Sequence, residues 1–153
     1  MSSIVLSLSG ALGLRRTMNK RQKAKKAGYD SHFELELHEG PLEGADYHTE
    51  KIRYEIPSRY AWYEPDFSVH SWLVEAKGRF RNRTEMDKYR YINTALKDTT
   101  KKLIFIFDNP DLPLPGAQKR KDGTKRSHAD WADSLGIRWL SKEDAHLIWE
   151  EKC

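Results

Sequence analysis

The chain has 153 residues, of which 38% are hydrophobic and 33% are charged, and this length fits one domain with a sizeable core. No run approaches the roughly 18–20 apolar residues that a membrane span needs. The net charge of +4 favours a polyanionic partner, although a ribosome or an anionic membrane surface would attract the same charge. The single cysteine, Cys153, excludes an internal disulfide and fits a reducing cytoplasm. The histidines of the N-terminal third, His32, His38 and His48, lack ligand spacing and are interpreted as surface or capping residues.

Residues 1–30 carry seven basic side chains against one acid, Asp30. Blocks of like charge repel, so this segment is predicted to be a flexible arm. Lys23, Lys25 and Lys26 are expected to contact DNA phosphates, and a solubilising tail is the alternative. The apolar run at 4–14 follows no basic residue, which argues against a signal peptide.

Ser31 and Glu34 have the spacing of a helix capping box, which predicts a short helix beginning at this point. The apolar alternation over 33–37 would also suit an extended segment. Residues 51–56 then alternate apolar and charged side chains, which predicts a half-buried strand that ends at Pro57.

Two short apolar runs, Phe67–Val69 and Trp72–Val74, flank a His-Ser pair and predict a tight β-hairpin. With the turn centred on that pair, Asp66 faces Glu75 directly across the two strands. Because strand side chains alternate, Lys77 lies on the same face as Glu75. Two carboxylates and one ammonium are therefore predicted to meet at one end of a sheet.

A close pair of carboxylates suits a hard cation such as Mg²⁺, with Mn²⁺ as a substitute, so Asp66 and Glu75 are candidate metal ligands. Lys77 can orient or help deprotonate a metal-bound water, or stabilise charge that develops on a phosphate. The predicted chemistry is metal-assisted hydrolysis of a phosphodiester. The alternative is a surface hairpin on which Lys77 merely compensates two like charges.

The segment after the hairpin is basic, and Arg79, Arg81 and Arg83 are predicted to contact phosphates beside the candidate site. Pairing with nearby acids is the alternative for these arginines. Thr84 is expected to cap a helix whose apolar stripe over 86–96 packs on the core.

The continuous apolar run 103–107 predicts a central strand that is buried on both faces and parallel to a neighbour. The long loop 109–126 is predicted to contact DNA through Lys119, Arg120 and Lys121, with a solvated flexible loop as the alternative.

A short helix over 130–135, a strand over 137–140 and a last helix over 141–151 complete the order of elements, with Trp149 turned toward the core. This order predicts an α/β fold in which helices flank a mixed β-sheet, as one domain over 31–153.

Pro65-Asp66 followed by Glu75-Ala76-Lys77 resembles the PD-(D/E)xK nuclease motif. With Pro57 and the C-terminal stretch 131–149, the chain from about Ser31 onward resembles bacteriophage endonuclease I, the Holliday-junction resolving enzymes of short-tailed phages. The region around Gly40 to Gly44 is shorter by a few residues than in that family.

The resemblance implies a restriction-endonuclease-like core and an intertwined homodimer that cuts four-way DNA junctions in the cytoplasm of the host cell. It implies that Asp66, Glu75 and the Ala76 carbonyl bind the metal. It also implies that Lys77 assists the attacking water and that Glu34 of the other subunit completes the site.

Three alternatives share part of this pattern. A related PD-(D/E)xK nuclease acting on linear, damaged or transposon-end DNA would keep the same site residues. A non-catalytic DNA-binding module of the same fold would bind branched DNA and ignore Mg²⁺. An RNA-binding or ribosome-associated protein would explain the charge and leave the hairpin triad unexplained.

Overall fold

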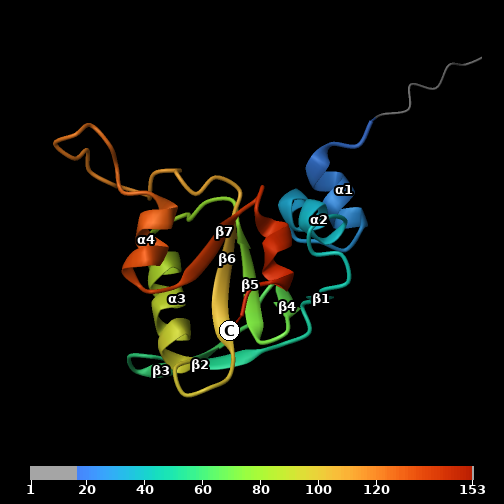
Figure 1. Ribbon diagram of the computed structural model, residues 1–153, viewed down its shortest axis with the longest axis horizontal. Coiled ribbons are helices and arrows are strands. Elements are labelled where there is room, and N and C mark those ends of the chain that lie inside the picture. The colour runs from blue at the N-terminus through green and yellow to red at the C-terminus, as the bar shows by residue number, and fades with distance from the viewer. Residues whose placement is uncertain (1–16, 153) are drawn as a thin grey trace, which may run out of the picture.

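The computed structural model describes residues 17–152, and a mixed five-stranded sheet forms its centre (Figure 1). The elements in chain order are α1 (Lys20–Lys26), α2 (His32–His38), β1 (Asp46–Tyr47), β2 (Ile52–Ile56), β3 (Arg59–Tyr63), β4 (Phe67–Val69), β5 (Trp72–Lys77), α3 (Arg83–Ala95), β6 (Lys102–Phe107), α4 (His128–Ser134), β7 (Arg138–Ser141) and the 3₁₀-helix η1 (Ala145–Trp149). The strand order is β1-β4-β5-β6-β7, antiparallel from β1 to β5 and parallel from β5 to β7. The predicted α/β class, with helices flanking a mixed sheet, is confirmed. Within the described residues, no helix combines the length and apolarity needed to cross a bilayer.

Strand β6 is the centre of two hydrophobic cores, because its side chains alternate between the two faces of the sheet. Leu103, Phe105 and Phe107 pack on one face, with α3, α4 and the β2–β3 hairpin. Ile104 and Ile106 pack on the other face, with α2 and η1. All five side chains are buried, so the predicted central parallel strand is confirmed.

The β4–β5 hairpin has the predicted register. Phe67 lies opposite Val74 and Val69 lies opposite Trp72, with the turn at the His-Ser pair. His70 has a φ of 53°, in the left-handed region that a tight two-residue turn requires. This register fixes which side chains meet at the far end of the hairpin.

The second hairpin, β2–β3, was predicted only in its first strand. Strand β3 pairs with β2 across a turn in which Ser58 has a φ of 80°. Its outward-facing aromatic side chains, Tyr60 and Trp62, are exposed, so no apolar alternation marks the strand. The inward-facing Tyr63 is buried in the core between the hairpin and α3.

Two predicted helix starts were wrong by two residues. Helix α3 is capped by Asn82 rather than Thr84, because the Asn82 side chain accepts a hydrogen bond from the backbone N–H of Glu85. Helix α4 begins before the predicted residue 130, because Ser127 caps it in the same way.

The last predicted helix is a short 3₁₀ turn, η1, that starts after Asp144 rather than at Ser141. Ile148 is fully buried in it. Trp149 is 40% exposed, which corrects the prediction that it turns toward the core, and its indole N–H donates to the Pro41 carbonyl at 3.0 Å.

Part of the predicted flexible arm is helical. Lys20–Lys26 form α1, which Asn19 caps and which buries Ala24. The segment after it is anchored by Tyr29, whose hydroxyl lies 2.6 Å from Nδ1 of His38 on α2. Residues 1–16 of the predicted arm, including the apolar run 4–14, lie outside the described residues.

We expect Phe105→Ala to lower the free energy of unfolding by about 3–5 kcal/mol, because it empties a fully buried site. The Phe105 ring lies 4.9 Å from that of Tyr89 and 5.6 Å from that of Trp131, measured between ring centroids. Urea denaturation checks this, with Trp62→Ala as the control: Trp62 is 69% exposed, and its loss should cost about 0.5 kcal/mol or less. Equal losses in the two variants would contradict the assignment of Phe105 to the core.

Candidate active site

The candidate site lies at the carboxyl end of β5, where the β4–β5 hairpin opens. Continuing the observed register by one pair places Asp66 opposite Glu75. The Asp66 Oδ2 accepts a hydrogen bond of 2.8 Å from the backbone N–H of Ala76. The Nζ of Lys77 lies 3.4 Å from Glu75 Oε1. The structure therefore brings together the three side chains that the hairpin pattern predicted.

Glu75 is held by two tyrosines that come from different elements. It is 6% exposed, and Tyr63 of β3 donates its hydroxyl to Oε2 at 2.8 Å. Tyr89 of α3 donates its hydroxyl to Oε1. Burial, together with the charge of Glu75, holds the pKa of both phenols well above the usual range, so both remain hydrogen-bond donors. Neither contact could be predicted from the sequence, because both depend on tertiary packing.

Lys77 is an ammonium held between two carboxylates. Its Nζ lies 2.8 Å from Glu85 Oε1 and 3.4 Å from Glu75 Oε1. Burial alone would lower the pKa of Lys77, but the attraction of Glu75 and the hydrogen bond to Glu85 outweigh it, and the pKa is raised. Glu85 is itself oriented by the backbone N–H of Arg81, at 2.7 Å. A lysine that keeps its proton stabilises negative charge and is poorly suited to act as a base.

The negative charge around Asp66 exceeds what the nearby positive groups neutralise. Burial and repulsion from Glu75 and Glu34 raise its pKa to about 9, although the Ala76 N–H and Lys77 oppose the shift. A carboxyl whose pKa is raised by neighbouring negative charge lies where a bound cation would be stabilised. The donor set, two carboxylates from Asp66 and Glu75, is of the kind that Mg²⁺ prefers.

The backbone of Ala76 is suited to join this donor set. In an extended strand the N–H and C=O of one residue point to the same side, so the Ala76 carbonyl points toward Asp66, as its N–H does. The continued register puts Pro65 opposite Ala76. Proline has no N–H to donate, so Pro65 leaves that carbonyl without a strand partner. The Pro-Asp pair thus supplies a carboxylate, from Asp66, and leaves the Ala76 carbonyl oxygen free of a strand hydrogen bond.

Glu34 reaches this cluster from the first turn of α2 in the same chain. It is 6% exposed, and its two oxygens accept hydrogen bonds from Ser31 Oγ at 2.7 Å and from Tyr47 Oη at 2.6 Å. Its charge contributes to the raised pKa of Asp66. The resemblance implies a glutamate from another subunit, whereas here Glu34 and Asp66 of one chain lie close together.

His48 lies between Glu34 and Asp66, which corrects the prediction that it is a surface or capping residue. Its Nε2 lies 3.5 Å from Asp66 Oδ1 and 4.0 Å from Glu34 Oε2, and its Nδ1 lies 3.3 Å from Glu64 Oε1. Its ring stacks on that of Tyr47, with centroids 3.9 Å apart. A lone histidine without a repeat at ligand spacing carries no sequence signal, so only the fold reveals this position.

A group of potential metal ligands lies next to the predicted one. Among the described residues, Asp30, Glu34 and His48 are the one set of three histidine, cysteine or acidic side chains whose ligand atoms all lie within 4.8 Å of one another. Asp66 and Glu75 do not form such a set with a third side chain of these types. A metal site at Asp66 and Glu75 would therefore need a backbone oxygen and water as further ligands, as Mg²⁺ sites commonly do.

The predicted DNA-contacting segments lie along the same edge of the sheet as the candidate site. In Figure 1, α1 and the loop between β6 and α4 project from the two ends of this edge, and the segment after β5 lies between them. Lys119 and Lys125 form a β-bridge in the projecting loop, so it is a hairpin rather than a structureless loop. All nine predicted residues are exposed: Lys23, Lys25, Lys26, Arg79, Arg81, Arg83, Lys119, Arg120 and Lys121.

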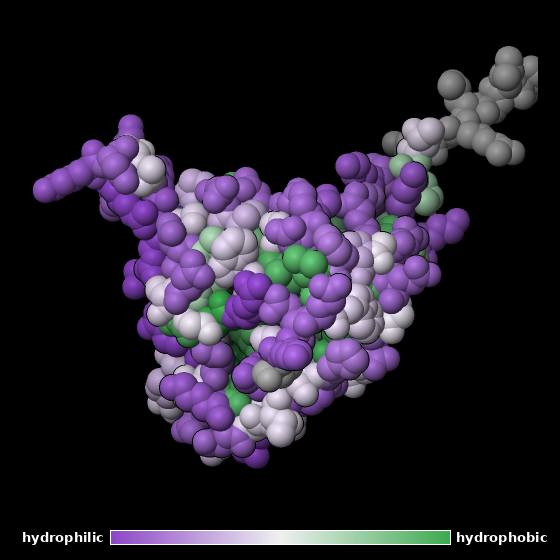
Figure 2. All heavy atoms as spheres, viewed as in Figure 1, coloured by the Kyte–Doolittle hydropathy of each residue, from purple (hydrophilic) through white to green (hydrophobic). Residues whose placement is uncertain are grey.

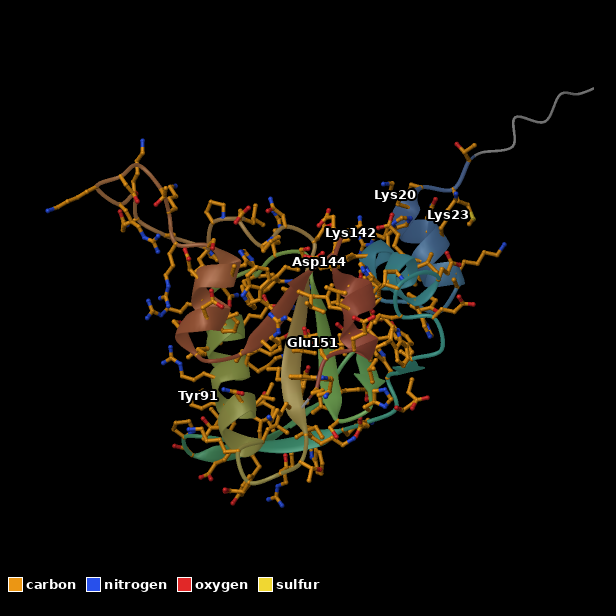
Figure 3. The ribbon with its side chains drawn as sticks, in the orientation of Figure 1. Lys20, Lys23, Tyr91, Lys142, Asp144 and Glu151 are labelled. Atoms are coloured by element: carbon orange, nitrogen blue, oxygen red, sulfur yellow. The ribbon has the colours of Figure 1, made fainter. Side chains whose placement is uncertain are left out.

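The surface along this edge is mainly hydrophilic on both projections, as Figure 2 shows. Figure 3 shows Lys20 and Lys23 on α1 at the same edge as Lys142, which follows β7. Some of the basic groups are paired within the chain: Arg120 lies 3.2 Å from Asp130, and Lys142 lies 3.2 Å from Glu36.

No protein-family model matches this chain, and no curated protein matches it in sequence. The resemblance to bacteriophage endonuclease I therefore rests on the motif residues and their spacing.

We expect the metal-free protein to lose stability as the pH rises from about 4 to 9. The unfolded Asp66 carboxyl ionises near its usual pKa of 3.8, whereas the folded one keeps its proton to about 9. Between these values the folded state binds more protons, so stability falls by at most about 1.4 kcal/mol per pH unit. Asp66→Asn removes this titrating group, so the stability of the variant should fall less steeply with rising pH than that of the wild type. Urea denaturation in EDTA at several pH values measures both slopes, and parallel slopes would contradict the raised pKa.

Proposed function

We propose that this chain is a metal-dependent endonuclease that hydrolyses phosphodiester bonds in branched DNA. The observation that carries the proposal is the meeting of Asp66, Glu75 and Lys77 at the end of one hairpin, with a backbone oxygen opened by Pro65. A structural triad would need only enough positive charge to balance its acids. The raised pKa of Asp66 means that Lys77 does not balance them, which supports a cation as the missing component.

The chemistry follows from the groups present. Mg²⁺ bound by Asp66, Glu75 and the Ala76 carbonyl would polarise a phosphoryl oxygen and activate a water. Lys77, as an ammonium, stabilises the negative charge that grows on the phosphate during attack. Tyr63 and Tyr89 fix the Glu75 carboxylate, so that it does not reorganise during the reaction.

DNA as the substrate is supported by the basic segments at this edge. The exposed lysines and arginines of α1, of the segment after β5 and of the projecting loop lie on both sides of the candidate site (Figure 1). Contacts with phosphates fix the position of a duplex without reading its sequence. We therefore expect recognition of DNA shape rather than of base sequence.

Four-way junctions are the substrate favoured by the resemblance to bacteriophage endonuclease I, together with a restriction-endonuclease-like core and a homodimer. Two sites related by a twofold axis match a junction, in which two opposed strands must be cut. Because Glu34 lies beside Asp66 of its own chain, the proposed site includes Glu34 in cis.

We expect Lys77→Ala to cut a four-way junction about 100- to 1000-fold more slowly than the wild type in Mg²⁺, because it removes the charge that stabilises the phosphate. End-labelled junction and matched linear duplex, each with Mg²⁺ or EDTA, measure this. Lys97→Ala, an exposed lysine after α3, should cut at the wild-type rate.

Each outcome of the cleavage experiment separates the alternatives. Equal cutting of the linear duplex would support a nuclease but contradict the junction preference. Tight binding of a junction that stays intact in both Mg²⁺ and Mn²⁺ would contradict the nuclease and support a non-catalytic binding module. Cutting by Lys77→Ala at the wild-type rate would leave the site assignment without support.

We expect the double variant Lys119→Gln, Lys121→Gln to bind junction DNA with a weaker salt dependence, its log–log slope falling by about 2. Both side chains are exposed on the projecting loop, so their loss should not change folding. Fluorescence anisotropy in EDTA at several salt concentrations gives the slope. The control is the double variant Arg59→Gln, Lys97→Gln, which removes the same charge outside the basic segments and should keep the wild-type slope. If the slope of this control fell by the same amount, the effect would come from net charge alone.

A further inference from the structure

A cavity of about 200 Å³ lies between α3 and the proline-containing segment Leu114–Gln118. On the α3 side it is lined by Arg83, Met86, Asp87 and Arg90. These residues are three, four and seven positions apart, so they form one stripe along the helix. The other helix face, with Glu85 and Tyr89, carries the contacts to Lys77 and Glu75. One helix thus lines both the candidate active site and this cavity.

The cavity is positively charged. Three arginines, Arg83, Arg90 and Arg126, line it together with one acidic residue, Asp87. Asp87 lies 3.9 Å from Arg90, an exposed pair that neutralises little, and Arg126 donates a hydrogen bond to Ser134 at 2.7 Å. The lining therefore keeps an excess of positive charge, which suits an anion such as a phosphate.

The cavity also has an apolar floor, formed by the buried side chains of Met86, Leu114 and Trp131. The segment that covers it is ordered by its own backbone. The N–H of Leu114 donates to the Arg126 carbonyl at 2.9 Å, and the N–H of Ala117 donates to the Leu114 carbonyl at 3.1 Å. A cavity with an apolar floor and a cationic rim fits a ligand that is flat and apolar at one end and anionic at the other.

The volume limits the ligand to a small one. Sites for drug-sized ligands are typically about 300–1,000 Å³, so 200 Å³ admits one nucleobase and not two stacked bases. We propose that this cavity binds a single nucleotide that has left the base stack of DNA, with its base on the floor formed by Met86 and Leu114 and its phosphate on the arginines. The choice of DNA as the polymer rests on the proposed function.

This assignment gives a physical origin for a preference for distorted DNA. In an intact duplex the bases are stacked, and extruding one costs free energy. At a bulge or a branch point an unpaired nucleotide is already free, so the cavity can bind it without that cost. Lys77 contacts the opposite face of α3 through Glu85, so a nucleotide held by Arg83 and Arg90 would be separated from the proposed reacting phosphate by the width of one helix.

The test compares two fluorescent DNA duplexes of equal length in EDTA, one fully paired and one with a single bulged thymidine. Wild-type protein should bind the bulged duplex about tenfold more tightly, the value of one well-placed hydrogen bond to a charged group. Arg90→Gln removes charge and Ala117→Phe fills the space, and both should bring the ratio close to one. Arg59→Gln, an exposed arginine of β3 outside the cavity, should keep the wild-type ratio.

Equal binding of the two duplexes by the wild type would overturn the inference, as would a tenfold preference retained in both Arg90→Gln and Ala117→Phe. Displacement of the bulged duplex by thymidine 5′-monophosphate should occur in the wild type and be lost in Ala117→Phe. Binding is measured in EDTA, which prevents metal-dependent cleavage, so this test is independent of the cleavage experiment. A protein that prefers the bulged duplex in EDTA but cuts no DNA in Mg²⁺ would refute the proposed nuclease and leave the cavity assigned. A nuclease without the preference would refute the cavity alone.

Discussion

The structure of the candidate site depends on the burial of one carboxylate, that of Glu75. A buried charge without partners costs several kcal/mol, so its partners must be in place whenever the chain is folded. Tyr63 arrives from the β2–β3 hairpin, Tyr89 from α3 and Lys77 from the same strand. The hairpin and α3 therefore pack where they do partly because each contributes a donor to this carboxylate.

The two carboxylates that face each other across the hairpin differ in how far their charge is satisfied. Glu75 has two phenol donors and a nearby ammonium. Asp66 accepts one backbone hydrogen bond and lies near Glu34 and His48. In the proposed site this asymmetry would give the carboxylates separate roles: Glu75 is held by its donors, and Asp66 is the position at which a cation would relieve repulsion.

Helix α3 joins the proposed catalytic and substrate-binding parts of the molecule. Its apolar stripe, which includes Tyr89 and Ile92, packs on the aromatic core around Phe105. The opposite face, which includes Arg83 and Arg90, lines the cationic cavity. Since a helix is stiff over this length, a ligand in the cavity and a phosphate near Lys77 would be held in fixed relation to one another.

The sequence by itself determined the elements whose signals are local. Alternation and the turn residues specified the β4–β5 register, and through it the meeting of Asp66, Glu75 and Lys77. A continuous apolar run identified β6, because a strand buried on both faces needs no polar side chain. The capping residue Ser31 identified the start of α2, and the starts of α3 and α4 were predicted to within two positions.

Only the tertiary structure decided which distant side chains complete the site. Tyr63, Tyr89 and Glu34 come from three different elements. His48 has no partner at ligand spacing in the sequence, and it lies near Asp66 because β1 pairs with β4. Contacts of this kind are set by how elements pack, and no short-range pattern of residue types records them. The same holds for the cavity beside α3, whose cationic lining is assembled from segments far apart along the chain.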